Sequence, residues 1–250
     1  MLHAFVPAGH MLLGNMQHWI CETCGVQYDA SSKPPASCLI CQDDRQYVAS
    51  SGQKWTSLRE MQGRFCNKTF QVANQVISIG PTQPKFAIGQ RALLIKTSQG
   101  NILWDCITML DDATKAEIDK HGGISMIAIS HPHFYDTMVA WAEAFKCKVL
   151  IHQADAKWVM RTDSIAKELL EFWSGNCKQL NDSIELVRLG GHFAGSCILY
   201  SKAGKGFICS GDTIQVTPDK MVSFMYRCVS VCEQLLIIIF RLTCPSLFAV

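Results

Sequence analysis

Short apolar runs separated by turn-forming residues recur along the chain, and each run predicts a buried strand or helix. Strands are expected over Val72–Gly80, Phe86–Thr97, Asn101–Cys106, Met126–Ile129, Cys147–His152, Ile184–Leu189, Ser196–Ser201 and Gly206–Cys209. Helices are expected over Asp111–His121, Thr137–Phe145 and Ser164–Ser174. Hairpins mixed with β-α-β passages indicate an α/β domain of packed layers, whose loops gather at one edge of the sheets.

Two histidines follow the buried run Met126–Ile129. His131 and His133 stand two positions apart, and in extended backbone such residues point to the same side of a strand. The two imidazoles can therefore reach one point in space, which is half of a metal site. Pro132 between them removes a backbone donor and suits a strand end that leaves its sheet. The alternative is a pair of ordinary histidines, satisfied at the surface or in the core.

Four cysteines early in the chain have the spacing of a zinc site. Cys21 and Cys24 form one C-x₂-C pair, Cys38 and Cys41 form another, and thirteen residues separate the pairs. Each pair can supply two thiolates, and the spacer lets the two pairs face each other around a tetrahedral ion. The alternative is four free or disulfide-bonded cysteines. We expect a structural zinc ribbon with four cysteine ligands over residues 18–48, stabilised by metal binding and without catalysis.

Composition limits the classes of partner and compartment. Of the 250 residues, 48% are apolar. The 23 basic and 21 acidic residues give a net charge of +2, which is too small to indicate binding to nucleic acid or to a membrane surface. Thirteen cysteines scattered through expected strands indicate a reducing compartment. The first 20 residues contain no Lys or Arg and no long apolar run, so we expect no secretory signal, and no run approaches the ~20 apolar residues that cross a bilayer. We therefore expect a cytoplasmic protein with a small-molecule substrate, and its oligomeric state is not indicated.

Further metal-binding residue types stand at the junctions of expected strands and loops. His192 is flanked by glycines, Asp212 directly follows the strand Gly206–Cys209 and its Ser-Gly, and His152 ends its own strand. The histidine pair, His192 and Asp212 each belong to a short motif, whereas His152 does not. The three motifs are His131-Pro-His133 with Asp136, Gly191-His192-x-x-Gly195-Ser196 and Ser210-Gly211-Asp212-Thr213. In order and separation these motifs resemble the His-x-His-x-Asp-His, histidine and Gly-Asp motifs of the metallo-β-lactamase superfamily. The resemblance covers about residues 72–226.

This resemblance implies an αββα sandwich over residues 70–227 with metal ions at the joined edges of its sheets. It implies a first site formed by His131, His133 and His192, with Asp212 bridging to a second ion. The implied activity is that of a metal-dependent hydrolase, in which a zinc-bound hydroxide attacks an ester, thioester, lactone or related electrophile. The alternative function is a catalytically degenerate binding module that keeps only its zinc ribbon.

The sequence also departs from the motifs of that superfamily. Tyr135 and Asp136 occupy the positions of its aspartate and third histidine. Asp136 is therefore either an oxygen ligand or the N-cap of the following helix, and Tyr135 is either a substrate-facing phenol or a buried wall residue. The His/Asp site accordingly holds one or two ions, and His152 has no counterpart among the usual ligands. No histidine follows His192, and residues 228–250 form an atypical tail that is either aberrant or an ordinary buried element.

Overall fold

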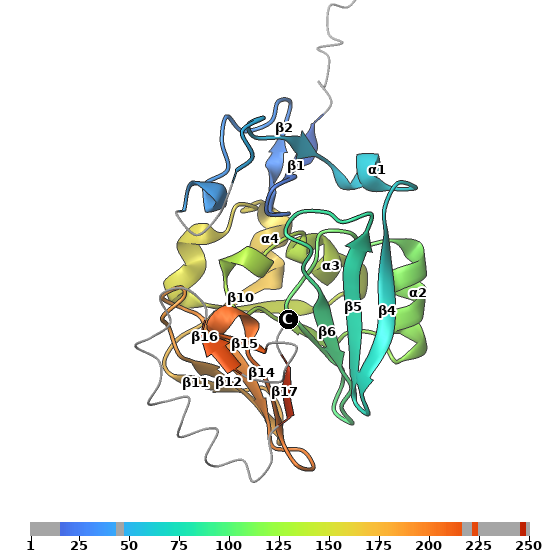
Figure 1. Cartoon of the computed structure of the whole chain (residues 1–250), viewed down its shortest axis with the longest axis vertical. Coiled ribbons are helices and arrows are strands. Elements are labelled where there is room, and N and C mark those ends of the chain that lie inside the picture. The colour runs from blue at the N-terminus through green and yellow to red at the C-terminus, as the bar shows by residue number, and fades with distance from the viewer. Residues whose placement is uncertain (1–15, 44–47, 217–221, 225–245, 249–250) are drawn as a thin grey trace, which may run out of the picture.

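The fold is an α/β sandwich of two sheets, with helices on one face and a small ribbon of strands above them (Figure 1). The computed structural model describes residues 16–43, 48–216, 222–224 and 246–248. Across these ranges, no helix combines the length and the apolar character that a membrane crossing requires. The α/β class expected from the sequence is confirmed.

The larger sheet has seven strands, and His131 and His133 lie just beyond the end of one of them. Its spatial order is β10 (Leu170–Trp173), β9 (Lys148–His152), β8 (Met126–Ala128), β7 (Ile102–Trp104), β6 (Ala92–Ile95), β5 (Val76–Gln83) and β4 (Cys66–Ala73). Strands β7 to β10 run parallel to one another, and β4 to β7 are antiparallel hairpin neighbours. The parallel half places the ends of β8 and β9 at one edge, where loops can gather.

The second sheet has five strands, in the order β11 (Cys177–Gln179), β12 (Ile184–Arg188), β13 (Cys197–Ser201), β14 (Phe207–Cys209) and β17 (Ser246–Phe248). The first four are antiparallel, and β17 pairs parallel with β14. A separate pair, β15 (Ile214–Val216) and β16 (Val222–Phe224), follows β14. Most of the tail predicted over residues 228–250 lies outside the described residues, and its described part is β17.

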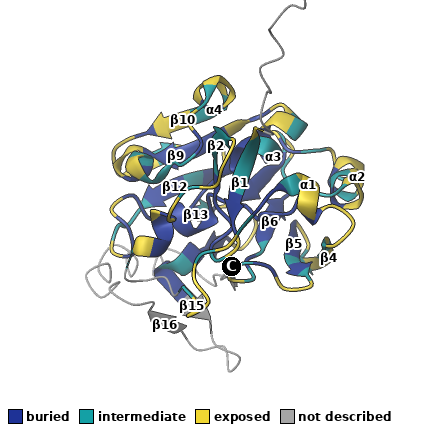
Figure 2. Cartoon of the chain, turned by 90° about the horizontal axis from the view of Figure 1, so that it is seen from above, coloured by how far each residue is buried: buried dark blue, intermediate teal, exposed yellow. Residues whose placement is uncertain are grey.

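The hydrophobic core lies in two layers, one on each side of the larger sheet. Alternate residues of its strands, such as Leu93 and Trp104, face inward-pointing residues of the second sheet, such as Leu186 and Leu199. The opposite face packs against the helices, and the darkest region of Figure 2 runs through both layers. In the described part of the chain, β15 rather than a helix packs on the outer face of the second sheet. Among the described residues no helix covers this face, and the outer helical layer implied by the resemblance stays a prediction.

Three helices cover the outer face of the larger sheet: α2 (Asp112–Lys120), α3 (Met138–Phe145) and α4 (Ser164–Leu169). Asp111 and Asp163 begin α2 and α4 as N-caps, because each carboxylate accepts a hydrogen bond from a backbone N–H of the first turn. Lys146 in the left-handed region, with φ 54°, ends α3. A short helix, α1 (Leu58–Met61), belongs to the upper part of the molecule.

Several predicted elements differ from the observed ones. The helix expected over Ser164–Ser174 is wrong in its second half, because Leu170–Trp173 form the strand β10 and pair with β9 instead of continuing α4. The single strand expected over Val72–Gly80 is broken by a turn between β4 and β5. The strand expected over Phe86–Thr97 begins only at Ala92, since positive φ angles at Ala87 and Gly89 make the preceding segment a loop. That loop carries Gln90.

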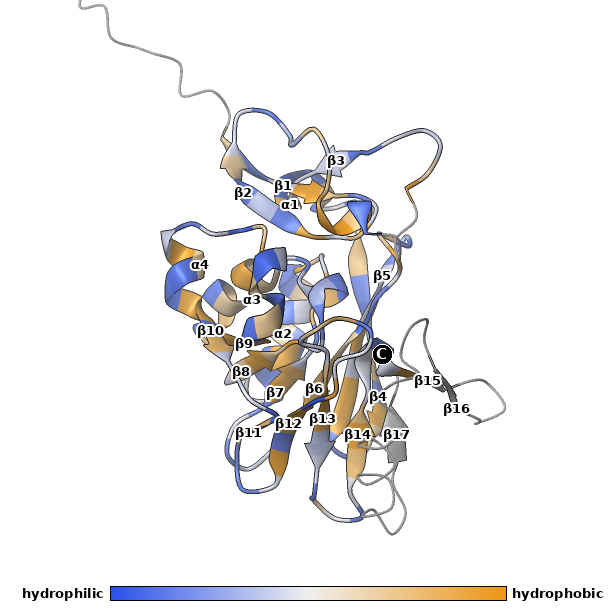
Figure 3. Cartoon of the chain, turned by 90° about the vertical axis from the view of Figure 1, so that its left-hand side faces the viewer, coloured by the Kyte–Doolittle hydropathy of each residue, from blue (hydrophilic) through white to orange (hydrophobic). Residues whose placement is uncertain are grey.

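A three-stranded sheet forms the upper part of the molecule. Its strands are β1 (Gln17–Cys21), β2 (Gln27–Ser31) and β3 (Trp55–Thr56), in the order β2-β1-β3, and a 3₁₀ turn spans Ile40–Gln42. In Figure 3 this ribbon sits above α3 and α4. The third strand of this sheet, β3, follows residue 48 in the sequence and pairs with β1. The domain boundaries at 48, 70 and 227 stay predictions.

Candidate metal centres

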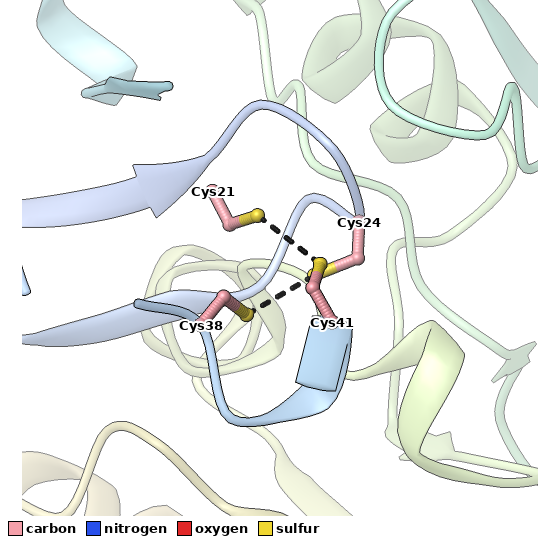
Figure 4. Close-up of side chains that lie close together, drawn as sticks. All are labelled: Cys21, Cys24, Cys38 and Cys41. Carbon is pink, nitrogen blue, oxygen red and sulfur yellow. Dashed lines mark hydrogen bonds between the residues drawn. The ribbon is translucent and has the colours of Figure 1, made fainter. Parts of the chain in front are cut away.

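The four cysteines of the ribbon converge, as Figure 4 shows. Cys21 ends β1, Cys24 lies in the turn that follows, Cys38 precedes the 3₁₀ turn Ile40–Gln42, and Cys41 lies within it. The Sγ atoms of Cys21 and Cys41 are 3.6 Å apart, and those of Cys24 and Cys38 are 3.7 Å apart. A tetrahedral zinc ion with thiolate ligands requires sulfur separations of about 3.8 Å.

The chemistry of this Cys group also suits a metal ion. All four cysteines are buried free thiols, so the disulfide alternative does not apply. Neighbouring cysteines, Cys21 foremost, lower the pKa of Cys38, which favours the thiolate that a metal requires. Gln53 Nε2 lies 2.9 Å from Cys21 Sγ and donates a hydrogen bond to it. The residues present therefore fit the zinc ion expected from the spacing, and Gln53 holds one of the four cysteines by a hydrogen bond.

A second group of four residues, the His/Asp group, joins both sheets at one edge. His131 follows β8, His133 lies in the 3₁₀ turn Pro132–Phe134, His192 lies in the loop between β12 and β13, and Asp212 follows β14. Their ligand atoms all lie within 4.8 Å of one another. The extended backbone assumed between His131 and His133 is wrong, because Pro132 starts a 3₁₀ turn just beyond the end of the strand. The two imidazoles converge through this turn instead.

The distances within the His/Asp group match those around a single ion. Nε2 of His192 lies 3.4 Å from Nδ1 of His133, and Nε2 of His131 lies 3.3 Å from Oδ2 of Asp212. Nitrogen and oxygen ligands of a tetrahedral zinc ion are about 3.3 Å apart. Among the residues that the structure describes, the buried Nε2 of His131 has this contact with Asp212 and no hydrogen bond, which is costly unless the nitrogen also binds something else. The residues present therefore fit a metal ion.

The electrostatics of the His/Asp group favour an ionised carboxylate. Burial by itself would raise the pKa of Asp212, but the imidazoles of His131, His133 and His192 outweigh burial and hold that pKa well below its ordinary value. The Asp212 side chain keeps 19% of its surface exposed, against 1% for His131. Access from solvent to the group is therefore on the Asp212 side.

Ser130 and Asp105 hold His131 in place. Ser130 Oγ lies 2.8 Å from Nδ1 of His131, which directs the other ring nitrogen into the group. Asp105 Oδ1 accepts a 2.7 Å hydrogen bond from the backbone N–H of Ser130. Burial raises the pKa of Asp105 to about 7, while the nearby His131 opposes that rise. Gly211 is a close neighbour, since a Cβ there would lie 2.6 Å from Ser130 Oγ.

The loop of His192 uses the glycines seen in the sequence. Gly190 and Gly191 have φ angles of 68° and 78°, which glycine adopts without strain. The backbone N–H of Gly195 donates a 2.8 Å hydrogen bond to Asp155 Oδ1, which fixes the far end of the loop. The ring of Phe193 packs edge-on against that of His133 with centroids 4.9 Å apart, and so walls the group with an apolar surface.

The structure leaves three candidate residues outside the His/Asp group. Asp136 bonds to Thr108 and Gln90 instead, and Thr137 rather than Asp136 begins α3, so the structure supports neither reading of Asp136. Tyr135 is 1% exposed, and its hydroxyl donates to the carbonyl of Asp155, as expected of a buried wall residue. His152 Nε2 lies 3.1 Å from the carbonyl of Gly175 and is not a member of the group.

Sequence reasoning did not single out four residues that support the two groups: Gln53, Gln90, Asp105 and Thr108. Asp105 alone carried a local signal, since it directly follows the apolar run Ile102–Trp104 in the way that Asp212 follows its own strand. The others act through contacts between distant segments.

Comparisons with known proteins place the chain beside one curated relative and several solved structures. No family model matches the sequence. An N-acyl homoserine lactone hydrolase with N-hexanoyl-L-homoserine at its catalytic metal center aligns with 64% of this chain and 79% of its own, at 15% identity and a TM-score of 0.48. The metallo-β-lactamase DIM-1 aligns with 61% of this chain and 72% of its own, at 13% identity and a TM-score of 0.47.

The placement of the three histidines and Asp212 agrees with the motif resemblance to the metallo-β-lactamase superfamily. The uncharacterized protein YmaE of Bacillus subtilis (strain 168) is 45% identical over 217 residues, which cover 84% of this chain and 77% of YmaE. Because this similarity extends over most of both sequences, the chain belongs to the same protein family as YmaE.

Proposed function

We propose that this protein is a hydrolase that binds one zinc ion at the His/Asp group and cleaves a small ester, thioester or lactone. The observation that carries the proposal is the convergence of four ligand atoms from three separate segments within 4.8 Å. Three of the side chains are buried, and burying several imidazoles and a carboxylate together is costly unless they bind something. A zinc ion bound there would lower the pKa of a bound water to about 7 and supply a nucleophile near neutral pH.

The chain's own residues would orient the ion and the substrate. His131, His133 and His192 would hold the ion through Nε2, Nδ1 and Nε2, the atoms that face the group. Asp212 stays ionised and is the most exposed member of the group, so it would face the substrate and orient the attacking water by accepting a hydrogen bond from it. Phe193 would exclude bulk water from one side.

The Cys group would hold a second zinc ion with a structural role. Four thiolates close the coordination shell, so such an ion has no position for substrate. The described residues around the His/Asp group do not select one electrophile, so a panel of generic esters, thioesters and lactones is the appropriate substrate screen.

Metal content and hydrolysis measured together test the proposal. The purified full chain should contain two zinc equivalents and turn over at least one member of the panel. His133→Ala should bind one zinc equivalent fewer and should lose turnover. The fall in turnover should exceed the roughly 10- to 100-fold that loss of an outer hydrogen-bond partner of a metal ligand costs. His121→Ala, which removes a surface imidazole at the end of α2, is the matched control and should keep both.

The binding-module alternative makes the opposite prediction for the same experiment. It requires a single equivalent at Cys21, Cys24, Cys38 and Cys41, with no turnover in any variant. One equivalent in the wild-type chain, unchanged in His133→Ala, would favour that alternative over the hydrolase.

A further inference from the structure

We propose that Gln90 is a positioning residue through which the Cys ribbon holds the loop of His131 and His133, so that metal at the Cys group raises the metal affinity of the His/Asp group. The inference rests on the proposed function only in requiring that the His/Asp group binds metal. It assigns the ribbon a task beyond its own stability, namely to hold the ligand loop of the second group in its binding geometry.

One side-chain nitrogen joins the two groups. Nε2 of Gln90 lies 2.9 Å from the carbonyl oxygen of His133 and 3.3 Å from that of Cys24. Oδ2 of Asp136 is 3.4 Å from the same nitrogen. Gln90 is buried, and a carboxamide has two N–H donors that a buried site must satisfy. The backbone of one ligand from each metal group is therefore tied to the same amide.

A second contact supports the same connection independently. Gly25, directly after Cys24, has φ +86°, and a Cβ there would lie 2.1 Å from Asp136 Oδ1 and 2.3 Å from Thr108 Oγ1. The N–H of Gln27 donates a 2.9 Å hydrogen bond to the carbonyl of Asp136. The ribbon backbone thus contacts Asp136, which lies three residues after His133, at both Gly25 and Gln27.

The Cys24 turn depends on the Cys group for its shape. Gly25 N donates to the carbonyl of Cys21 at 2.8 Å, and Cys21 N donates to that of Val26 at 3.0 Å, which makes a tight loop between two ligands. Sites of this kind couple metal binding to local folding. Without an ion the turn loosens, Gln90 loses the Cys24 acceptor, and the His133 carbonyl loses a fixed donor. The His/Asp group then has to order its own loop when it binds metal, which lowers its affinity.

The ribbon has another anchor that offers a matched control. Asp29 of β2 accepts hydrogen bonds from the backbone N–H and the hydroxyl of Thr162, both at 2.7 Å, and from Asp163 N at 3.0 Å. These partners belong to the segment that begins α4 rather than to the loop of His131 and His133. Loss of this anchor weakens docking of the ribbon and leaves the Gln90 bridge in place.

Cobalt binding to the metal-free full chain tests the proposal without any substrate. Equilibrium dialysis gives total bound cobalt, and the thiolate-to-cobalt charge-transfer absorption reports the share at the Cys group. The variants are Gln90→Met, the pair Cys38→Ser and Cys41→Ser, all three changes together, and the control Asp29→Ala. Thermal unfolding of each variant gives the accompanying loss of stability.

Gln90→Met should lower the cobalt affinity of the His/Asp group by about 10- to 100-fold, the range for outer partners of metal ligands. The cysteine pair should cause a similar loss, and the triple variant should lose no more than the larger single loss, because both changes break the same link. Asp29→Ala should lower the unfolding midpoint and leave the affinity of the His/Asp group unchanged, a difference that a merely structural role for Gln90 would not produce.

Unchanged affinity in Gln90→Met, or losses that multiply in the triple variant, would overturn the proposal. If the variant with both cysteine changes fails to fold, the cobalt affinities of Gln90→Met and Asp29→Ala still decide whether Gln90 supports the His/Asp group. A wild-type chain that binds cobalt only at the Cys group would overturn the proposed hydrolase as well. Cobalt binding at both groups, with an affinity of the His/Asp group that Gln90→Met leaves unchanged, would overturn only the proposed coupling.

Discussion

The hydroxyl of Thr108 donates a hydrogen bond to Oδ1 of Asp136, and both residues are buried beneath the Cys ribbon. Burial raises the pKa of Asp136 well above its ordinary value, while the bond from Thr108 opposes the rise. A carboxyl group that is enclosed and favours its neutral form is a poor metal ligand. The sequence left open one or two ions at the His/Asp group, and this contact favours one.

Asp136→Asn therefore should leave the metal content at two equivalents per chain, one at each group. The carboxamide has the shape of the neutral carboxyl and keeps an oxygen for the Thr108 hydroxyl. Asp212→Asn is the comparison, because it removes a charge that faces three imidazoles and should weaken binding at the His/Asp group. Plasma mass spectrometry after gel filtration measures both. Loss of a full equivalent in Asp136→Asn would show that Asp136 binds metal.

Gly25→Ala should destabilise the protein strongly, because the new methyl group meets the pair Asp136 and Thr108. The left-handed backbone and the overpacking together should cost about 2–5 kcal/mol. Gly63→Ala is the matched control, since Gly63 has φ +72° with no atom within 4 Å of a built Cβ, and should cost only about 1–2 kcal/mol. Denaturant unfolding measures both free energies. Equal losses in the two variants would mean that the ribbon does not press on Asp136.

The sequence predicted those parts of the sites that depend on local spacing. Cys21 and Cys24 lie on one turn because two residues separate them, and the glycines before His192 adopt the positive φ angles that their type permits. Apolar runs located most strands for the same reason, since burial follows the pattern within a few residues. The convergence of His131 and His133 was also predicted, although a turn rather than an extended strand produces it.

Contacts between residues far apart in the sequence could not be predicted from the local pattern of apolar and polar positions. Gln90 lies in an apolar run that predicts a strand, and only its position beneath the Cys24 turn makes it a bridge. Leu170–Trp173 continue a helical pattern in the sequence, but an open edge of β9 pairs with them, and tertiary pairing overrides local propensity. Asp136 matched a motif position, yet Thr108 and Gly25, far away in sequence, decide where its carboxyl group points.

Ser130→Ala should lower the metal affinity of the His/Asp group by about 10- to 100-fold, because it removes the oxygen that orients His131 through Nδ1. Ser78→Ala is a control of the same chemistry, since Ser78 is fully buried and its hydroxyl donates only to the carbonyl of Gly80, at 3.4 Å, among the described contacts. Competition with a chromophoric chelator gives both affinities. Equal affinities in the two variants would remove Ser130 from the support of the site.

Tyr135→Phe should leave hydrolysis unchanged and lower stability slightly. The Tyr135 hydroxyl donates a 3.3 Å hydrogen bond to the carbonyl of Asp155, and the residue is 1% exposed, so its phenol stabilises the fold and does not meet the substrate. Loss of one such bond costs about 0.5–1.5 kcal/mol. Denaturant unfolding and steady-state kinetics on the same preparation separate the two effects. A fall in kcat without a change in unfolding free energy would instead place the phenol at the reacting centre, where it would stabilise the developing oxyanion.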